Sequence, residues 1–266
     1  MRPERNRSSW NRANTRGYRV TGSSISSTIS KDFYVNLRVE NLSTPFLKGI
    51  SFALGDEDAV ILGANGAGKT TLARALVGLY ETPAVYAEGK QIAELGAKLR
   101  AQLLNFVPSR LDVFDEYIDA EAFLKLSLLN GSTQKNLEAV MARLDIAGLR
   151  NTPCRCLSSG ESQLLLFAGG LLHNARLTIF DEPTANLDSD KKIKLFGMLK
   201  EHPGRKIVIT HDLNLAYRLG YRILYLREGE LVFDGSGNDF FEESRFRSLF
   251  GDSICRIEGH FTVNYR

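Results

Sequence analysis

The sequence predicts an α/β fold with a mostly parallel central sheet, an N-terminal antiparallel β subdomain and an inserted α-helical subdomain. Three observations indicate this class. Short apolar segments alternate with helical segments in the second half of the chain, as they do in parallel sheets that helices cover on both faces. Two segments near the start alternate apolar and polar residues, and a long helical stretch lies in the middle of the chain.

The first elements account for the predicted antiparallel subdomain and the start of the central sheet. "FYVNLRVENL" (33–42) and "FLKGISFAL" (46–54) alternate apolar and polar residues, as half-buried strands do. "DAVILG" (58–63) is a short apolar run between turn residues, which is typical of a buried strand. The segment "KTTLARALVGL" (69–79) then has a helical pattern.

The helical subdomain is expected at about residues 109–170, where "EAFLKLSLL" and "NLEAVMARLDIAGL" have helical spacing. Two further apolar runs, "LTIFD" (177–181) and "KIVIT" (206–210), resemble buried strands, and the helical "SDKKIKLFGMLK" (189–200) separates them. This strand–helix–strand order favours parallel pairing.

Charge divides the chain into two parts. Residues 1–31 contain six Arg, one Lys and one Glu, so the whole chain's net charge of +3 leaves −3 for the remainder. We therefore predict a disordered, basic Arg/Ser-rich leader at 1–33 and one domain at 34–266. The acidic remainder argues against a broad nucleic-acid-binding face. The longest apolar run, "LLLFAGGLL", is shorter than the roughly 20 residues that span a bilayer.

A glycine-rich loop predicts phosphate binding and hence a P-loop NTPase. Residues 63–70, "GANGAGKT", match G-x-x-x-x-G-K-[ST] between a predicted strand and a predicted helix. Gly63, Gly66 and Gly68 let the backbone amides approach a phosphate. Lys69 supplies a positive charge to the β- and γ-phosphates, and the Thr70 hydroxyl is a ligand for Mg²⁺. The alternative, a glycine-rich turn that matches by accident, does not explain this context.

Two acidic residues and a histidine follow the later strands. Asp181 and Glu182 end the "LTIFD" strand, and His211 follows "KIVIT", at the edge where open α/β sheets hold their ligands. Asp181 is a candidate Mg²⁺ ligand, Glu182 a candidate base for an attacking water, and His211 a candidate donor to the γ-phosphate. The alternatives are a solvated acidic turn and a structural histidine.

The stretch "LSSGE" (157–161) precedes an apolar helical run. Ser158 and Glu161 have the spacing of a capping box, and the amides around Gly160 are suited to an anion. The two interpretations are compatible.

Taken together, "GANGAGKT", "LSSGE", "TIFDEPTANLD" and "ITHD" resemble the ordered motifs of ATP-binding cassette (ABC) ATPases, over roughly residues 34–266. The resemblance implies ATP and Mg²⁺ as cofactors, Glu182 as general base and His211 as a γ-phosphate contact. It implies Mg²⁺ contacts from Thr70, Asp181 and Ser109. The phosphate-binding segment of the family corresponds here to Gly63, Asn65, Gly66, Ala67, Gly68, Lys69, Thr70 and Thr71.

The resemblance also implies a head-to-tail dimer with ATP at the interface. Ser158, Ser159, Gly160 and Glu161 correspond to the signature motif, which contacts ATP held by the second copy, and Asp188 would lie near that interface. Two residues depart from the family pattern. Ser109 stands where the family usually has Gln, and Ser159 replaces the first signature glycine.

Adenine recognition is less clearly encoded. Phe46 and Tyr34 are the candidates for stacking on the base, because the segment "NLSTPFLKG" is short.

The resemblance predicts the ATP-binding and ATP-hydrolysing subunit of an ABC transporter, a cytoplasmic protein held at the inner face of the membrane by integral permease subunits. The C-terminal "DFFEESRFRSLFGDSICRIEGHFTV" resembles the tails of importer cassettes for iron–siderophore complexes and vitamin B12. One alternative is a soluble ABC ATPase that acts on nucleic acid or the ribosome, although we expect no nucleic-acid partner. Another is a low-turnover regulatory cassette.

Overall fold

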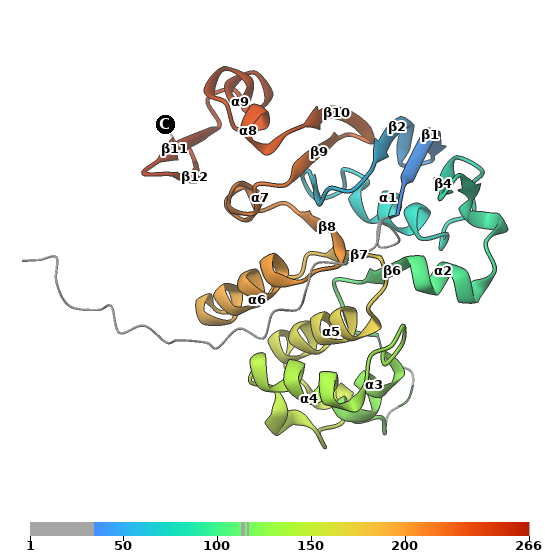
Figure 1. The fold of residues 1–266 in the computed structure, drawn as a ribbon. Helices are drawn as coiled ribbons and strands as arrows, with labels where there is room; N and C mark the ends of the chain where they lie inside the picture. Colours follow the sequence, from blue (N-terminus) through green and yellow to red (C-terminus); the bar gives the residue numbers. More distant parts are fainter. Residues whose placement is uncertain (1–34, 113–114, 116, 266) are drawn as a thin grey trace, which may run out of the picture. The chain divides into compact units, whose positions relative to one another are not determined.

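The computed structural model describes residues 35–112, 115 and 117–265, so the predicted leader at 1–33 lies outside the described residues. Its central sheet has six strands in the order β10-β9-β3-β8-β7-β6 (Figure 1). Neighbouring strands from β9 to β6 are parallel, and β10 pairs antiparallel with β9. The strands are β3 (Ala59–Leu62), β6 (Leu104–Val107), β7 (Leu177–Asp181), β8 (Arg205–Thr210), β9 (Arg222–Arg227) and β10 (Glu230–Gly235). The mostly parallel sheet is therefore confirmed.

The central strands are apolar because both faces of the sheet are covered. All four residues of β3 are buried. Ala59 and Ile61 belong to one hydrophobic cluster, whereas Val60 and Leu62 belong to another. Since successive side chains of a strand point to opposite faces, the sheet separates two cores, and this requires a continuously apolar strand.

One core lies between the central sheet, helix α1 (Lys69–Leu76) and a four-stranded antiparallel sheet. That second sheet has the order β2-β1-β4-β5, as the early alternating segments predicted in part. Its strands are β1 (Leu37–Thr44), β2 (Leu47–Leu54), β4 (Val85–Ala87) and β5 (Lys90–Gln91). A short 3₁₀ helix (Ile92–Glu94) and α2 (Ala97–Leu103) then lead into β6.

The other core includes the predicted helical insertion, which gathers at one end of the ribbon in Figure 1. It consists of α3 (Ala120–Leu126), α4 (Gln134–Arg143) and α5 (Ser159–His173), with 3₁₀ turns at Ala147–Leu149 and Cys154–Cys156. Helix α5 also packs closely on the sheet. A Cβ at Gly170 would lie 2.5 Å from Val107 Cγ2 and 2.7 Å from Phe180 Cε1, so glycine is required for this approach.

The C-terminal part packs against the strands β3, β8, β9 and β10 of the central sheet. It contains α7 (Leu213–Leu219), α8 (Gly237–Phe240), α9 (Glu243–Phe250) and a hairpin of β11 (Ile254–Ile257) and β12 (His260–Val263), whereas α6 (Ser189–Glu201) connects β7 to β8. The Asn214 amide both donates to and accepts from the Phe261 backbone, at 3.0 and 2.8 Å. This pair attaches the hairpin to α7. No helix of the described residues is long and apolar enough to cross a membrane.

The buried His202, directly after α6, predicts acid sensitivity. Its Nε2 has no hydrogen-bond partner among the described residues, and burial, assisted by Lys206, lowers the pKa of its imidazole from 6.5 to about 4. In the unfolded chain His202 binds a proton as the pH falls below about 6.5, whereas in the folded chain it stays neutral until about pH 4. The free energy of unfolding therefore falls as the pH drops from 6.5 towards 4. Between pH 7 and pH 5 we expect protonation linked to His202 to lower the free energy of unfolding by about 2 kcal/mol.

Urea unfolding of the wild type and of His202→Gln at pH 7 and pH 5 measures this loss. The wild type should lose about 2 kcal/mol more than the variant. Equal losses in the two proteins would show that His202 does not cause the acid sensitivity.

Candidate functional site

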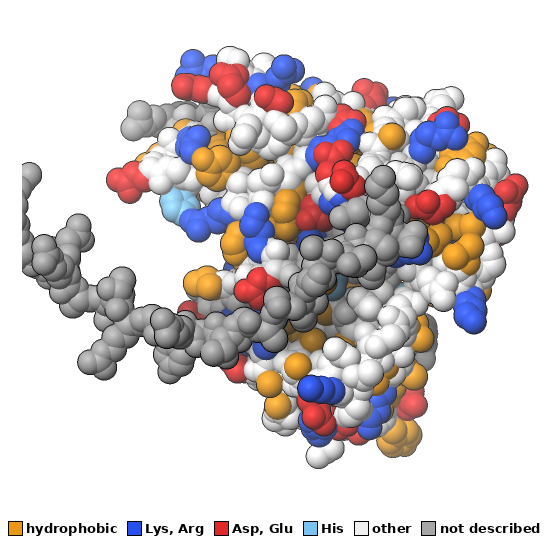
Figure 2. All heavy atoms as spheres, in the orientation of Figure 1, with side chains coloured by type: hydrophobic (Ala, Val, Ile, Leu, Met, Phe, Trp, Pro, Cys, Tyr) orange, Lys and Arg blue, Asp and Glu red, His pale blue; other side chains and the backbone are white. Residues whose placement is uncertain are grey.

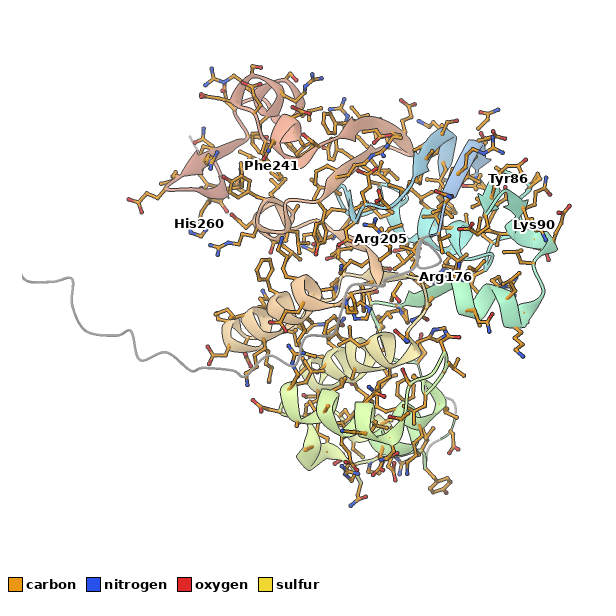
Figure 3. The ribbon with its side chains drawn as sticks, viewed as in Figure 1. Tyr86, Lys90, Arg176, Arg205, Phe241 and His260 are labelled. Carbon is orange, nitrogen blue, oxygen red and sulfur yellow. The ribbon has the colours of Figure 1, made fainter. Side chains whose placement is uncertain are left out.

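The predicted site residues come together at the carboxyl edge of the central sheet. Arg176 and Arg205 lie side by side at the amino ends of β7 and β8 (Figure 3), where the Arg205 N–H donates to the Arg176 carbonyl at 3.1 Å. Asp181 and Thr210 end the same strands at the opposite edge. Strand β3 pairs with both β8 and β9, so the loop that follows it begins at this edge, where such sheets bind ligands.

The glycines of this loop have distinct structural reasons. Gly66 and Gly68 have φ values of 81° and 97°, in the left-handed region that disfavours other residues. A Cβ at Gly63 would lie 2.5 Å from the Leu226 carbonyl oxygen, and one at Gly68 would lie 2.6 Å from Leu47 Cδ2. The loop ends at the N-terminus of α1, a combination that suits an anion.

Lys69 is almost fully buried behind the loop, with 7% of its surface exposed. Its Nζ donates to the carbonyl oxygens of Gly63 and Ala64 at 2.8 and 3.0 Å and lies 4.0 Å from Glu182 Oε1. Burial lowers the pKa of this ammonium group, and the Glu182 and Asp181 carboxylates oppose that shift. The positive charge is thus held at the loop by contacts that a phosphate can replace.

Thr70 and Asp181 form an oxygen-rich pair next to the loop. The Thr70 hydroxyl donates to Asp181 Oδ2 at 2.8 Å, and only 3% of Asp181 is exposed. Burial raises the pKa of the Asp181 carboxyl, and the hydrogen bond from Thr70 partly offsets this rise. A hydroxyl and a carboxylate are hard oxygen donors that fit Mg²⁺, and Ser109 lines the same cavity.

Glu182 leaves the strand in a left-handed conformation, with φ of 48°. This is uncommon for a residue with a side chain, and the backbone is held there because the Glu182 N–H donates to the Ile209 carbonyl at 2.9 Å. Its Oε1 lies 2.7 Å from His211 Nδ1, and its Oε2 accepts from the Thr210 hydroxyl at 3.3 Å. The two predicted residues Glu182 and His211 are therefore in direct contact.

A cavity of about 370 Å³ joins most of these groups. Phe46 lies at its rim with 67% of its surface exposed, whereas Tyr34, the other stacking candidate, lies outside the described residues. The lining residues are Phe46, Asn65, Gly66, Gly68, Lys69, Thr70, Thr71, Ser109, Asp181 and Glu182.

The signature residues form a second, separate group. Ser158 caps α5, because its Oγ accepts from the Glu161 N–H at 3.3 Å while Glu161 Oε2 accepts from the Ser158 N–H at 2.8 Å. The Ser158 hydroxyl also donates to Glu161 Oε2 at 2.7 Å, and this bond, with the one from the Ser158 N–H, lowers the pKa of Glu161. The capping box is thus confirmed, but in the described chain none of the residues 158–161 lines the cavity.

The signature helix contacts the segment that contains Asp188. A Cβ at Gly160 would lie 3.1 Å from the Asn186 carbonyl oxygen, so the start of α5 packs on this segment. Asp188 caps α6 by accepting from the Lys191 N–H at 3.0 Å. Ser159, Gly160 and Asp188 therefore belong to one surface that is distinct from the cavity of the same chain.

Thr210 had no predicted role, although it precedes His211 in the segment "ITHD". Its position at the last residue of a buried strand was the available signal. Its hydrogen bond to Glu182 depends on the pairing of β7 with β8, which the motif alone does not reveal.

Comparison with known proteins gives a consistent family assignment. Residues 47–185 match the ABC transporter family. A putative ABC transporter ATP-binding protein of Bacillus cereus is 31% identical over 218 residues, which are 75% of this chain and 38% of that protein. The chain thus spans less than two-fifths of that relative's length. The zinc import ATP-binding protein ZnuC of Magnetococcus marinus is 28% identical, over 83% of each chain.

Solved structures show the same fold. A dimeric ATP-binding cassette in a post-hydrolysis state, bound to ADP and Pi, superposes with a TM-score of 0.65 at 24% identity. The match covers 75% of this chain and 98% of that one.

Proposed function

The chain belongs to the ABC transporter family, and we propose that it is the subunit that binds and hydrolyses ATP while separate membrane subunits move the cargo. The observation that carries this proposal is the cavity at the sheet edge, where Lys69, Thr70, Asp181 and Glu182 lie together beside the glycine-rich loop. These residues supply the positive charge, the metal ligands and the base that ATP hydrolysis requires.

ATP binding is proposed to use the loop amides of residues 63–71 and the Lys69 ammonium. Lys69 Nζ would exchange its hydrogen bonds to the Gly63 and Ala64 carbonyls for bonds to phosphate oxygens. Phe46 is exposed at the cavity rim, which supports it as the ring that stacks on the base. An exposed aromatic ring gains apolar contact from such stacking.

Mg²⁺ is proposed to bind at the Thr70 hydroxyl and the Asp181 carboxylate, with Ser109 on the same cavity wall. A divalent cation bound there would neutralise negative charge on the nucleotide phosphates. The short Ser109 side chain stands where the family pattern has a longer amide.

Glu182 is proposed as the base that takes a proton from the attacking water at its carboxylate. The contact between His211 Nδ1 and Glu182 Oε1 supports a role for the imidazole beside this base, and His211 would turn to the γ-phosphate. These two residues and Lys69 are then the groups that change partners when nucleotide binds.

A second copy of the chain is proposed to complete the site. The signature residues 158–161 do not line the cavity of their own described chain, which supports a role for them on nucleotide held by a second copy. One helix N-terminus contributes only about 0.3–1 kcal/mol to an exposed anion, which is too little to capture ATP alone. The signature surface, with Asp188, would therefore close on ATP that the partner's loop already holds.

The membrane partner and the cargo are proposed by analogy with the relatives. We infer integral permease subunits as partners, with this chain at the inner face of the membrane, and the zinc importer relative supports a metal-containing cargo. On the face seen in Figure 2, Lys and Arg side chains are interspersed with Asp and Glu. That face is unlike the continuous basic surface of a nucleic-acid-binding protein.

The solution mass of Glu182→Gln with and without MgATP tests this proposal. The variant should bind ATP without consuming it, so its mass in sedimentation should double with MgATP and remain that of one chain with MgADP. The control is Glu182→Gln combined with Lys69→Ala, and its sedimentation mass should remain that of one chain with either MgATP or MgADP. A Glu182→Gln protein that remains one chain at saturating MgATP would contradict the head-to-tail dimer.

A further inference from the structure

We propose that Thr210 is a positioning residue for hydrolysis, which holds the Glu182 carboxylate while Lys69 and His211 change partners. This inference rests on the proposed function, in which Glu182 is the base. Thr210 is the last residue of β8 and is fully buried. Its backbone is therefore held by the sheet, where it pairs with Leu62 of β3.

The direction of the Thr210 hydrogen bonds is determined by their partners. The Asp212 N–H donates to Thr210 Oγ1 at 3.0 Å, so this oxygen is an acceptor from that side. An ionised carboxylate only accepts hydrogen bonds, and the hydroxyl proton of Thr210 is thus directed to Glu182 Oε2 at 3.3 Å. This distance is long for an O–H···O bond, as is common in catalytic sites before substrate is bound.

The two oxygens of Glu182 have different kinds of partners. Oε1 lies 2.7 Å from His211 Nδ1 and 4.0 Å from Lys69 Nζ, two groups that the proposed function moves to the phosphates. Oε2 has Thr210 as its hydrogen-bond partner among the described residues. When nucleotide binds, Thr210 is therefore the contact that remains on the carboxylate, and it leaves Oε1 free to accept the proton from water.

Without this contact the carboxylate would lose its orientation. Glu182 is already in a left-handed backbone conformation, and its side chain is 17% exposed, so it has room to rotate. Thr210→Val keeps the shape of the side chain but removes both hydrogen bonds, whereas Thr210→Ser keeps the hydroxyl. Comparison of the two variants therefore distinguishes the effect of the hydroxyl from the effect of side-chain packing.

Steady-state MgATP hydrolysis and equilibrium ATP binding by both variants test the inference. Thr210→Val should lower kcat about tenfold or more, because a hydrogen bond to a charged group is lost, with the ATP Kd within about twofold of the wild type. Thr210→Ser should recover most of the kcat. In the Glu182→Gln background, Thr210→Val should cause no further loss, since the base on which it acts is already absent.

Several outcomes would overturn the inference. One is an unchanged kcat in Thr210→Val, and another is a loss of kcat that Thr210→Ser does not recover. The others are a rise in the ATP Kd of Thr210→Val as large as its loss of kcat, and a further loss of kcat when Thr210→Val is added to Glu182→Gln. If wild type and Glu182→Gln differ as expected but Thr210→Val is fully active, this inference alone fails. If the wild type does not hydrolyse MgATP, the proposed function and the inference fail together.

Discussion

Replacing Glu182 by Gln should lower kcat for MgATP hydrolysis by about 10²–10⁴-fold, the usual contribution of a general base. The amide keeps the shape of the side chain, but it has no carboxylate to take a proton from water. Lys69, Thr70 and Asp181 are untouched, so the ATP Kd should stay close to that of the wild type. Phosphate release and equilibrium nucleotide binding, measured on the same preparation, separate the two effects.

Glu201→Gln is the matched control for this change. Glu201 is an exposed carboxylate at the end of α6 that pairs with Arg143, and it lies outside the cavity. Its substitution should leave hydrolysis unchanged. A Glu182→Gln protein that hydrolyses ATP as fast as this control would show that Glu182 is not the base.

Replacing Lys69 by Ala should weaken ATP binding by about 3 kcal/mol, or about two orders of magnitude in Kd. Lys69 is the buried cation at the loop and contacts the Gly63 and Ala64 carbonyls. Removing it leaves the phosphates without that charge, whereas the loop amides remain. Hydrolysis should fall with binding, since fewer sites hold nucleotide. Titration with a fluorescent ATP analogue measures the change.

Lys194→Ala provides the comparison for Lys69→Ala. Lys194 is a more exposed lysine on α6 that pairs with Asp145, and its removal should not change the ATP Kd. If Lys69→Ala binds ATP as tightly as Lys194→Ala does, the glycine-rich loop is not the nucleotide site.

Local sequence patterns predicted three strands of the central sheet, β3, β7 and β8, and one half of the site, but not β6, β9 and β10. The strands β3, β7 and β8 contain short apolar runs because each is buried on both faces, and this signal is visible in a short window of sequence. The phosphate-loop residues are contiguous, Asp181 ends a recognisable strand, and Glu182 and His211 each directly follow one. Since parallel strands end at the same edge, their proximity followed from the predicted sheet.

Features that depend on long-range contacts were not predictable in the same way. The closeness of Thr210 to Glu182 requires the pairing of β8 with β7, and the need for glycine at Gly68 comes from Leu47 in the antiparallel sheet. His202 acquires its lowered pKa from burial that no local pattern reports. The separation of Ser158 and Gly160 from the cavity is likewise a property of the three-dimensional arrangement.

The central claim, that this chain drives a membrane transporter, is tested most directly by purification of its partners. Tagged Glu182→Gln, isolated with MgATP from detergent-solubilised membranes of the source cell, would be analysed by mass spectrometry. The account predicts a polytopic membrane protein in near-equal amount to the tagged chain. Ribosomal or nucleic-acid-binding proteins in its place, or no partner at all, would contradict it.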